Sequence, residues 1–186
     1  MVLCRFEVLT MRKEHFVIFS LIAIGVIGRF IPHPPNATPI TAITIAASRH
    51  VGRFWSLTTP IVAMTISDAV IGFYNWKILV SVYASFALIG AISLWARKYP
   101  SRMPTWFLVV SASFLFFIVT NFATWLFSPW YEKNVSGLLY SYELGVPFLR
   151  NMLLGDVAYT LMISALARGM TSASRVPRLY AQGGMS

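Results

Sequence analysis

The fold class is decided by residues 76–95, WKILVSVYASFALIGAISLW. The single charged residue in this stretch is Lys77, at its start. A membrane-spanning helix needs roughly 20 mostly apolar residues, so this segment is long enough to cross a bilayer. A second stretch, Thr105–Phe127, has no charged residue at all. The two stretches predict an all-α integral membrane protein.

The whole chain has the same character, with 57% hydrophobic and only 11% charged residues among 186, against about 25% charged in soluble domains. We predict one bundle of six transmembrane helices over residues 16–168, between an N-terminal tail (1–15) and a basic C-terminal tail (169–186). The apolar runs are Phe16–Phe30, Pro39–Ser48, Phe54–Tyr74, Trp76–Trp95, Thr105–Phe127 and Phe148–Arg168.

The second run, Pro39–Ser48, is too short to span a bilayer at about 1.5 Å per residue. We therefore expect it to be a short or broken helix packed inside the bundle, where its backbone can be satisfied by protein.

Basic residues predict the orientation of the bundle. With both chain ends in the cytoplasm, 11 of the 15 lysines and arginines fall on the cytoplasmic side, and four fall outside: Arg29, Lys77, Lys133 and Arg150. This is the bias of the positive-inside rule. The net charge of +9 then reflects topology and contact with anionic lipid, and no nucleic-acid partner is expected.

Polar side chains recur on single helical faces near the outer ends of the predicted spans. Asn121 and Trp125 share one face, and Asn151, Asp156 and Tyr159 lie on one arc of another helix. Such groups are costly in lipid and mark functional sites by default. We predict an outward-facing cavity, capped by aromatic residues of a loop over 128–146. Its candidate binding residues are His33, Asp68, Tyr83, Asn121, Trp125, Arg150, Asn151, Asp156 and Tyr159.

Structural interpretations of the same residues stay open. Asp68 and Asp156 could pair with Arg29 or Arg150 to neutralise buried charge. Asn121 could bond across helices, the aromatic residues could form an interfacial belt, and His33 could be an exposed residue of a Pro-rich turn. The only cysteine is Cys4, which excludes an intramolecular disulfide and a cysteine-built zinc site; no metal site is predicted.

Four short strings resemble a family of small bacterial membrane proteins described as transporters. They are RFIPHPPNATP (29–39), SD with GFY (67–68 and 72–74), TNFATW (120–125), and PFLRN with LGD (147–151 and 154–156). That family is similar to the substrate-binding S components of energy-coupling-factor (ECF) vitamin transporters, including solitary vitamin B12 uptake proteins. The resemblance implies a six-helix protein of the bacterial inner membrane that binds a vitamin, cobalamin or another, from the outer face. It also implies an ECF T component and ATPases as partners, with Ala42 and Ala46 as docking residues.

The leading hypothesis is therefore a non-enzymatic uptake protein without a resident cofactor. The sequence has no P-loop of the kind that cradles nucleotide phosphates, so any ATP-driven step would need separate subunits. Proton-coupled transport through Asp68 or Asp156 is one alternative, and a structural or assembly subunit is another. A less favoured alternative is an intramembrane hydrolase that uses the two aspartates as an acid/base dyad.

Overall fold

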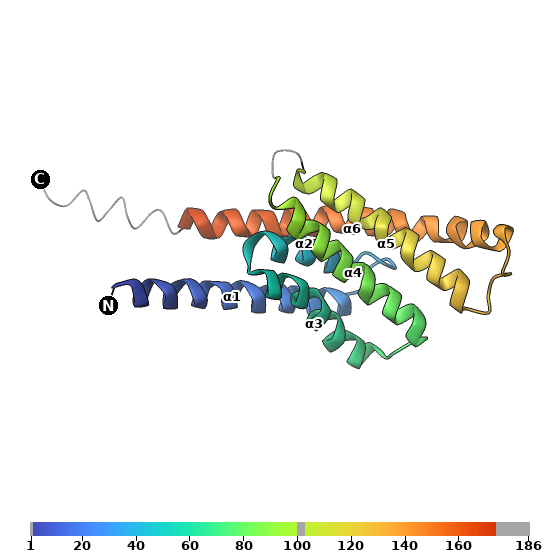
Figure 1. The fold of residues 1–186 in the computed structure, drawn as a ribbon, viewed down its shortest axis with the longest axis horizontal. Coiled ribbons are helices and arrows are strands. Elements are labelled where there is room, and N and C mark those ends of the chain that lie inside the picture. Colours follow the sequence, from blue (N-terminus) through green and yellow to red (C-terminus); the bar gives the residue numbers. More distant parts are fainter. Residues whose placement is uncertain (1, 100–102, 174–186) are drawn as a thin grey trace, which may run out of the picture.

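Six α-helices and no strand make up residues 2–99 and 103–173, the part of the chain that the computed structural model describes. The all-α prediction is confirmed. Successive helices run in alternating directions, and α1 begins at the end of the bundle where α6 finishes (Figure 1). We call this the terminal end and the opposite one the distal end. The helices are α1 (Val2–Phe30), α2 (Ile40–His50), α3 (Arg53–Ile71), α4 (Trp76–Ala96), α5 (Thr105–Phe127) and α6 (Val135–Ala173).

Two predicted boundaries differ from the structure. Helix α1 begins at Val2, so residues 2–15 are helical and not an irregular tail; no Gly or Pro interrupts them. Helix α6 begins at Val135, where the Asn134 side chain accepts a hydrogen bond from the Gly137 N–H at 2.7 Å. The apolar run that starts at Phe148 therefore marks only the later part of this helix, and Pro147 lies inside it.

The longer α6 shortens the predicted 128–146 loop to residues 128–134. Tyr140 and Tyr142 are therefore helical residues, and the aromatic cap expected from this loop is reduced to Trp130 and Tyr131. The helix also continues to Ala173, past the predicted end at Arg168. The rest of the predicted C-terminal tail lies outside the described residues.

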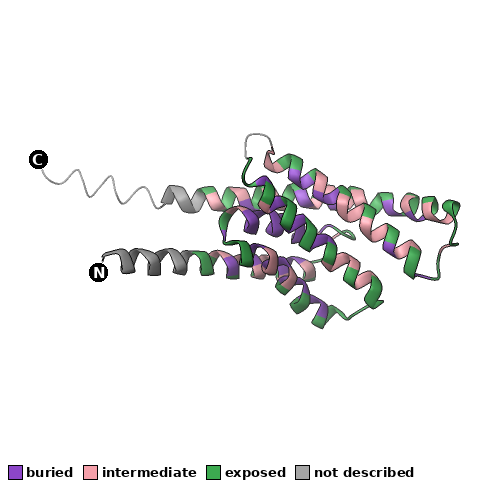
Figure 2. Ribbon diagram, viewed as in Figure 1, coloured by how far each residue is buried: buried purple, intermediate pink, exposed green. Residues whose placement is uncertain are grey.

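Helix α2 is the centre of the bundle. All residues from Ile40 to Ser48 are buried, and α2 packs against each of the other five helices (Figure 2). Its 11 residues correspond to about 16 Å, too short for a span. The prediction of a short helix inside the bundle is confirmed.

Several polar groups of α2 are satisfied by the protein. Thr44 Oγ1 donates to the Ile40 carbonyl at 2.7 Å. At the other end the Arg97 guanidinium of α4 donates to the carbonyls of Ser48 and Val51 at 3.4 and 3.1 Å. Because the last carbonyls of a helix have no partner within the helix, Arg97 closes the end of α2.

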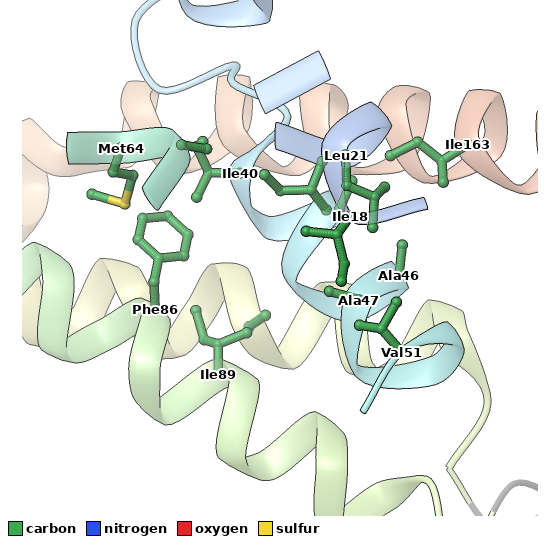
Figure 3. Packing of buried hydrophobic residues seen from close by; sticks show 14 residues of the cluster. Ile18, Leu21, Ile40, Ala46, Ala47, Val51, Met64, Phe86, Ile89 and Ile163 are labelled. Atoms are coloured by element: carbon green, nitrogen blue, oxygen red, sulfur yellow. The ribbon is translucent and has the colours of Figure 1, made fainter. Parts of the chain in front are cut away.

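Close helix approach depends on small residues. At Gly25 of α1 a Cβ would lie 2.6 Å from the Ile43 side chain, and at Gly155 of α6 it would lie 2.9 Å from the Ala37 backbone. The Gly25 contact joins two helices, as small residues do where helices associate in membranes, whereas Ala37 lies in the loop between α1 and α2. The apolar core surrounds α2, and Ile40, Met64 and Phe86 converge at one side of it (Figure 3).

Three helices, α3, α4 and α5, are long and apolar enough to cross a membrane. Most of their residues are not buried inside the bundle, and large apolar side chains such as Val70, Trp76 and Trp106 are exposed. Soluble monomers rarely expose apolar surface on this scale. The fold therefore fits a membrane protein.

Candidate ligand-binding site

A charged network ties three helices together at the distal end. Asp68, in the last turn of α3, is 2% exposed, and its Oδ1 lies 2.6 Å from Nη2 of Arg29, at the end of α1. The Tyr83 hydroxyl of α4 donates to Oδ2 of Asp68 at 2.8 Å. Both carboxylate oxygens are thus occupied, and the guanidinium is held in place.

Helix α3 stops directly after this network. Gly72 has a φ of 106° and its N–H donates to the Asp68 carbonyl at 2.9 Å. Glycine adopts this φ without the steric cost that other residues incur. The following loop carries Tyr74, whose pKa is raised to about 12 by burial first and then by the negative charge of Asp68.

Two adjoining cavities lie beside the network. The first has a volume of about 290 Å³ and is lined by Arg29, Asn36, Thr38, Ile40, Met64, Tyr74, Val82, Phe86, Phe116 and Met152. The second has a volume of about 530 Å³ and includes Asn121, Thr124, Trp130 and Tyr131 in its walls. They share Asn36, Val82 and Phe116. Ligand pockets usually measure about 300–1,000 Å³ with mostly apolar walls and few polar groups, which matches this pair.

Arg29 lines the first cavity, and one nitrogen of its guanidinium has no partner among residues 2–99 and 103–173. Its Nη2 is engaged by Asp68, while Nη1 is buried and has no hydrogen-bond partner in the described part of the chain. A buried donor without a partner costs about 1–3 kcal/mol. A ligand that brings a carbonyl or carboxylate oxygen to Nη1 would remove that cost.

Asp156 forms a separate buried cluster. It is 0% exposed, and Ser113 Oγ of α5 donates to its Oδ2 at 2.7 Å. The Thr41 side chain of α2 also interacts with this carboxyl group, and Oδ1 has no hydrogen bond of good geometry among the described residues. Met152, one turn before it, lines the distal cavity. Thr160, one turn after it, lines a cavity of about 340 Å³ at the terminal end. Asp156 thus lies on α6 between the two cavities.

The two aspartates have different partners, and no hydrogen bond joins them within the described residues. The pairing expected of Asp68 with Arg29 is present. Arg150 is exposed and forms no ion pair with a described residue, so it pairs with neither aspartate. In the described residues the two carboxylates are thus held by separate partners, Asp68 by Arg29 and Tyr83 and Asp156 by Ser113.

The other predicted residues divide into two groups. Asn121 lines the second cavity. Asp68 forms the ion pair with Arg29, and Tyr83 donates a hydrogen bond to Asp68. His33 instead bonds to the Pro34 carbonyl at 2.9 Å, and Trp125 donates Nε1 to the Glu132 carbonyl at 2.8 Å. Neither these two nor Arg150, Asn151, Asp156 and Tyr159 line the distal cavities.

Several lining residues are not among the predicted binding residues. Arg29 was expected only as an ion-pair partner of Asp68 or Asp156. Asn36 and Thr38 lie in the Pro-rich segment of residues 29–39, from which only His33 was chosen. Phe86, Phe116 and Met152 have no signal of their own, since an apolar residue facing a cavity and one facing lipid look alike in sequence.

The predicted docking pair is enclosed. Ala42 and Ala46 are 2% and 9% exposed and lie on α2, which the other five helices surround. A partner could reach them only if those helices moved apart. Both residues instead line the cavity at the terminal end.

Comparison with known proteins gives one match. Residues 10–179 match DUF6580, a family of unknown function. No curated protein and no solved structure matches the chain. The match covers all six helices except the start of α1.

Proposed function

The chain belongs to the DUF6580 family, and because the function of that family is unknown, we propose one from the geometry above: a membrane protein that binds a vitamin-sized organic molecule at its distal end for uptake. The observation that carries the proposal is the pair of adjoining cavities beside Arg29. Their combined space suits a small heterocyclic molecule with an acceptor group directed at Arg29 Nη1.

The proposal places the protein in the bacterial inner membrane with both ends in the cytoplasm. Three helices of sufficient length and apolarity support membrane embedding. The excess of basic residues at the terminal end supports the orientation, which makes the distal cavities open to the outer face.

The proposal includes energising partners of the ECF type, a T component and ATPases, because the sequence has no nucleotide-binding loop of its own. Docking through Ala42 and Ala46 would require α2 to be uncovered. An outer surface of the bundle is the more direct place for such a contact.

Ligand binding can be tested by native mass spectrometry of the gently purified protein, together with thermal stability in a panel of vitamins that includes cobalamin. Val82 lines both cavities, so Val82→Trp should fill the site and abolish binding. Val80 lies on the same helix and is 56% exposed, so Val80→Trp is the matched control. An empty wild-type protein that no vitamin stabilises would contradict the proposal, as would equal binding by Val82→Trp.

Topology can be tested separately in a Cys4→Ser background. Val135→Cys, at the distal end, should react with a membrane-impermeant maleimide in intact cells. Lys98→Cys, at the terminal end, should react only after permeabilisation. The reverse pattern would place the cavities on the cytoplasmic side.

A further inference from the structure

A groove at the terminal end lies outside the site described above. It is formed where α3 begins and α4 ends and has a volume of about 590 Å³. Its lining consists of Arg53, Leu57, Ala91, Leu94, Trp95, Arg97 and Lys98. Three cations and one tryptophan thus stand beside three apolar side chains.

Among the described residues, no acidic side chain pairs with these cations. Arg53 and Lys98 are exposed and form no ion pair with a described residue. The first turn of α3 has no acidic residue, and α4 has none in its whole length. Arg97 is held by the carbonyls of Ser48 and Val51, which also leaves its positive charge unpaired. The groove is therefore strongly positive.

The polar and apolar parts of the lining are separated along the helices. Arg97 and Lys98 follow the last residue of α4, and Arg53 is the first residue of α3. Leu57 lies one turn further along α3, while Ala91 and Leu94 lie one to two turns back along α4. The small side chain of Ala91 keeps this part of the groove open. Trp95 lies at the junction, as aromatic residues do at a membrane interface.

We propose that this groove binds an anionic phospholipid. The headgroup phosphate lies among Arg53, Arg97 and Lys98, and an acyl chain follows Leu57, Ala91 and Leu94 toward the middle of the bilayer. Basic pockets between membrane helices are suited to anionic headgroups. A soluble anion would use the cations but leave the apolar part exposed to water, so the lining favours a lipid. The inference rests on membrane embedding and is independent of what the distal cavities bind.

The experiment uses the full chain in nanodiscs of phosphatidylcholine with a minor fraction of phosphatidylglycerol. The protein is released from the nanodiscs, and the lipids that stay bound to it are counted by native mass spectrometry. The wild type should retain phosphatidylglycerol in preference to phosphatidylcholine. Each basic residue near an anionic surface is worth roughly fivefold in binding, so Arg53→Gln/Lys98→Gln should lower this preference about 25-fold.

The matched control is Lys77→Gln/Arg150→Gln, which removes two exposed cations at the distal end and should leave the preference unchanged. Circular dichroism and gel filtration check that both double variants are folded. A separate arm adds inorganic phosphate to protein in detergent and should produce no stabilisation. Equal retention of the two lipids would overturn the proposal, as would an equal loss in the control variant or full competition by phosphate. A chain that does not enter nanodiscs would overturn membrane embedding itself.

Discussion

Nη2 of Arg29 lies 2.6 Å from Oδ1 of Asp68 at the distal end of the bundle, and this ion pair joins the end of α1 to the end of α3. The pair has two roles that differ in kind. It neutralises a carboxylate that is almost fully buried, and it fixes a guanidinium whose Nη1 has no hydrogen-bond partner among the residues that the structure describes. The same contact therefore stabilises the fold and prepares the first cavity for a ligand.

Replacing Asp68 by Asn should destabilise the protein by about 3 kcal/mol, because breaking a buried ion pair leaves the other charge uncompensated. Arg29 is 18% exposed, which places the expected loss at the lower end of the range. Tyr83→Phe removes one hydrogen bond from the same carboxylate and should cost about 1 kcal/mol. Thermal and denaturant unfolding in detergent measure both. Wild-type stability of Asp68→Asn would show that the pair is not structural.

Replacing Ser113 by Ala should cost about 1–3 kcal/mol, because it removes the hydrogen bond that Oδ2 of Asp156 receives and leaves a buried carboxyl group unsatisfied. Ser85→Ala is the matched control, since Ser85 is also buried but donates only to a carbonyl of its own helix. It should cost less than 1 kcal/mol.

The coupling between Ser113 and Asp156 can be isolated with Asp156→Asn and the double variant. In a double-mutant cycle, residues in direct contact show an interaction energy of about 0.5–3 kcal/mol. Strictly additive effects would contradict a specific contact between the two side chains.

Gly155→Ala should destabilise the bundle by about 1–3 kcal/mol through overpacking. The added Cβ would lie 2.9 Å from the Ala37 backbone, which cannot move aside as a flexible side chain would. Gly52→Ala is the control, because a Cβ there meets nothing within 4 Å, and it should change stability by less than about 0.5 kcal/mol. Equal unfolding midpoints for the two variants would contradict the tight contact between α6 and the 31–39 loop.

The Trp125→Phe variant tests whether Trp125 stabilises the fold or contacts the ligand. The indole N–H holds the Glu132 carbonyl at 2.8 Å, and Trp125 lines neither distal cavity. The variant should lose about 1 kcal/mol of stability and keep any ligand that the wild type binds. If the variant lost ligand affinity while its melting temperature stayed unchanged, Trp125 would be a ligand-binding residue.

The arrangement of the helices was largely predictable because apolar run length is a strong signal. The short run at Pro39–Ser48 also indicated an enclosed helix. The start of α6 was not predictable from Pro147, because a proline within a helix is tolerated where packing supplies the other contacts. At the site, the expected pairing of Asp68 with Arg29 is present, whereas Arg150 has the same residue type as Arg29 but is exposed. The difference lies in the packing of α1 against α3, which no local pattern in either segment encodes.

The enclosed position of α2 has a consequence for biosynthesis. A helix of 11 residues cannot leave the translocon as a span of its own, since its ends would reach lipid with unpaired backbone groups. Arg97, which closes the end of α2, is synthesised two helices later. Helix α2 also packs against α5 and α6, so we expect it to reach its final place only when the later helices are present, and not one span at a time.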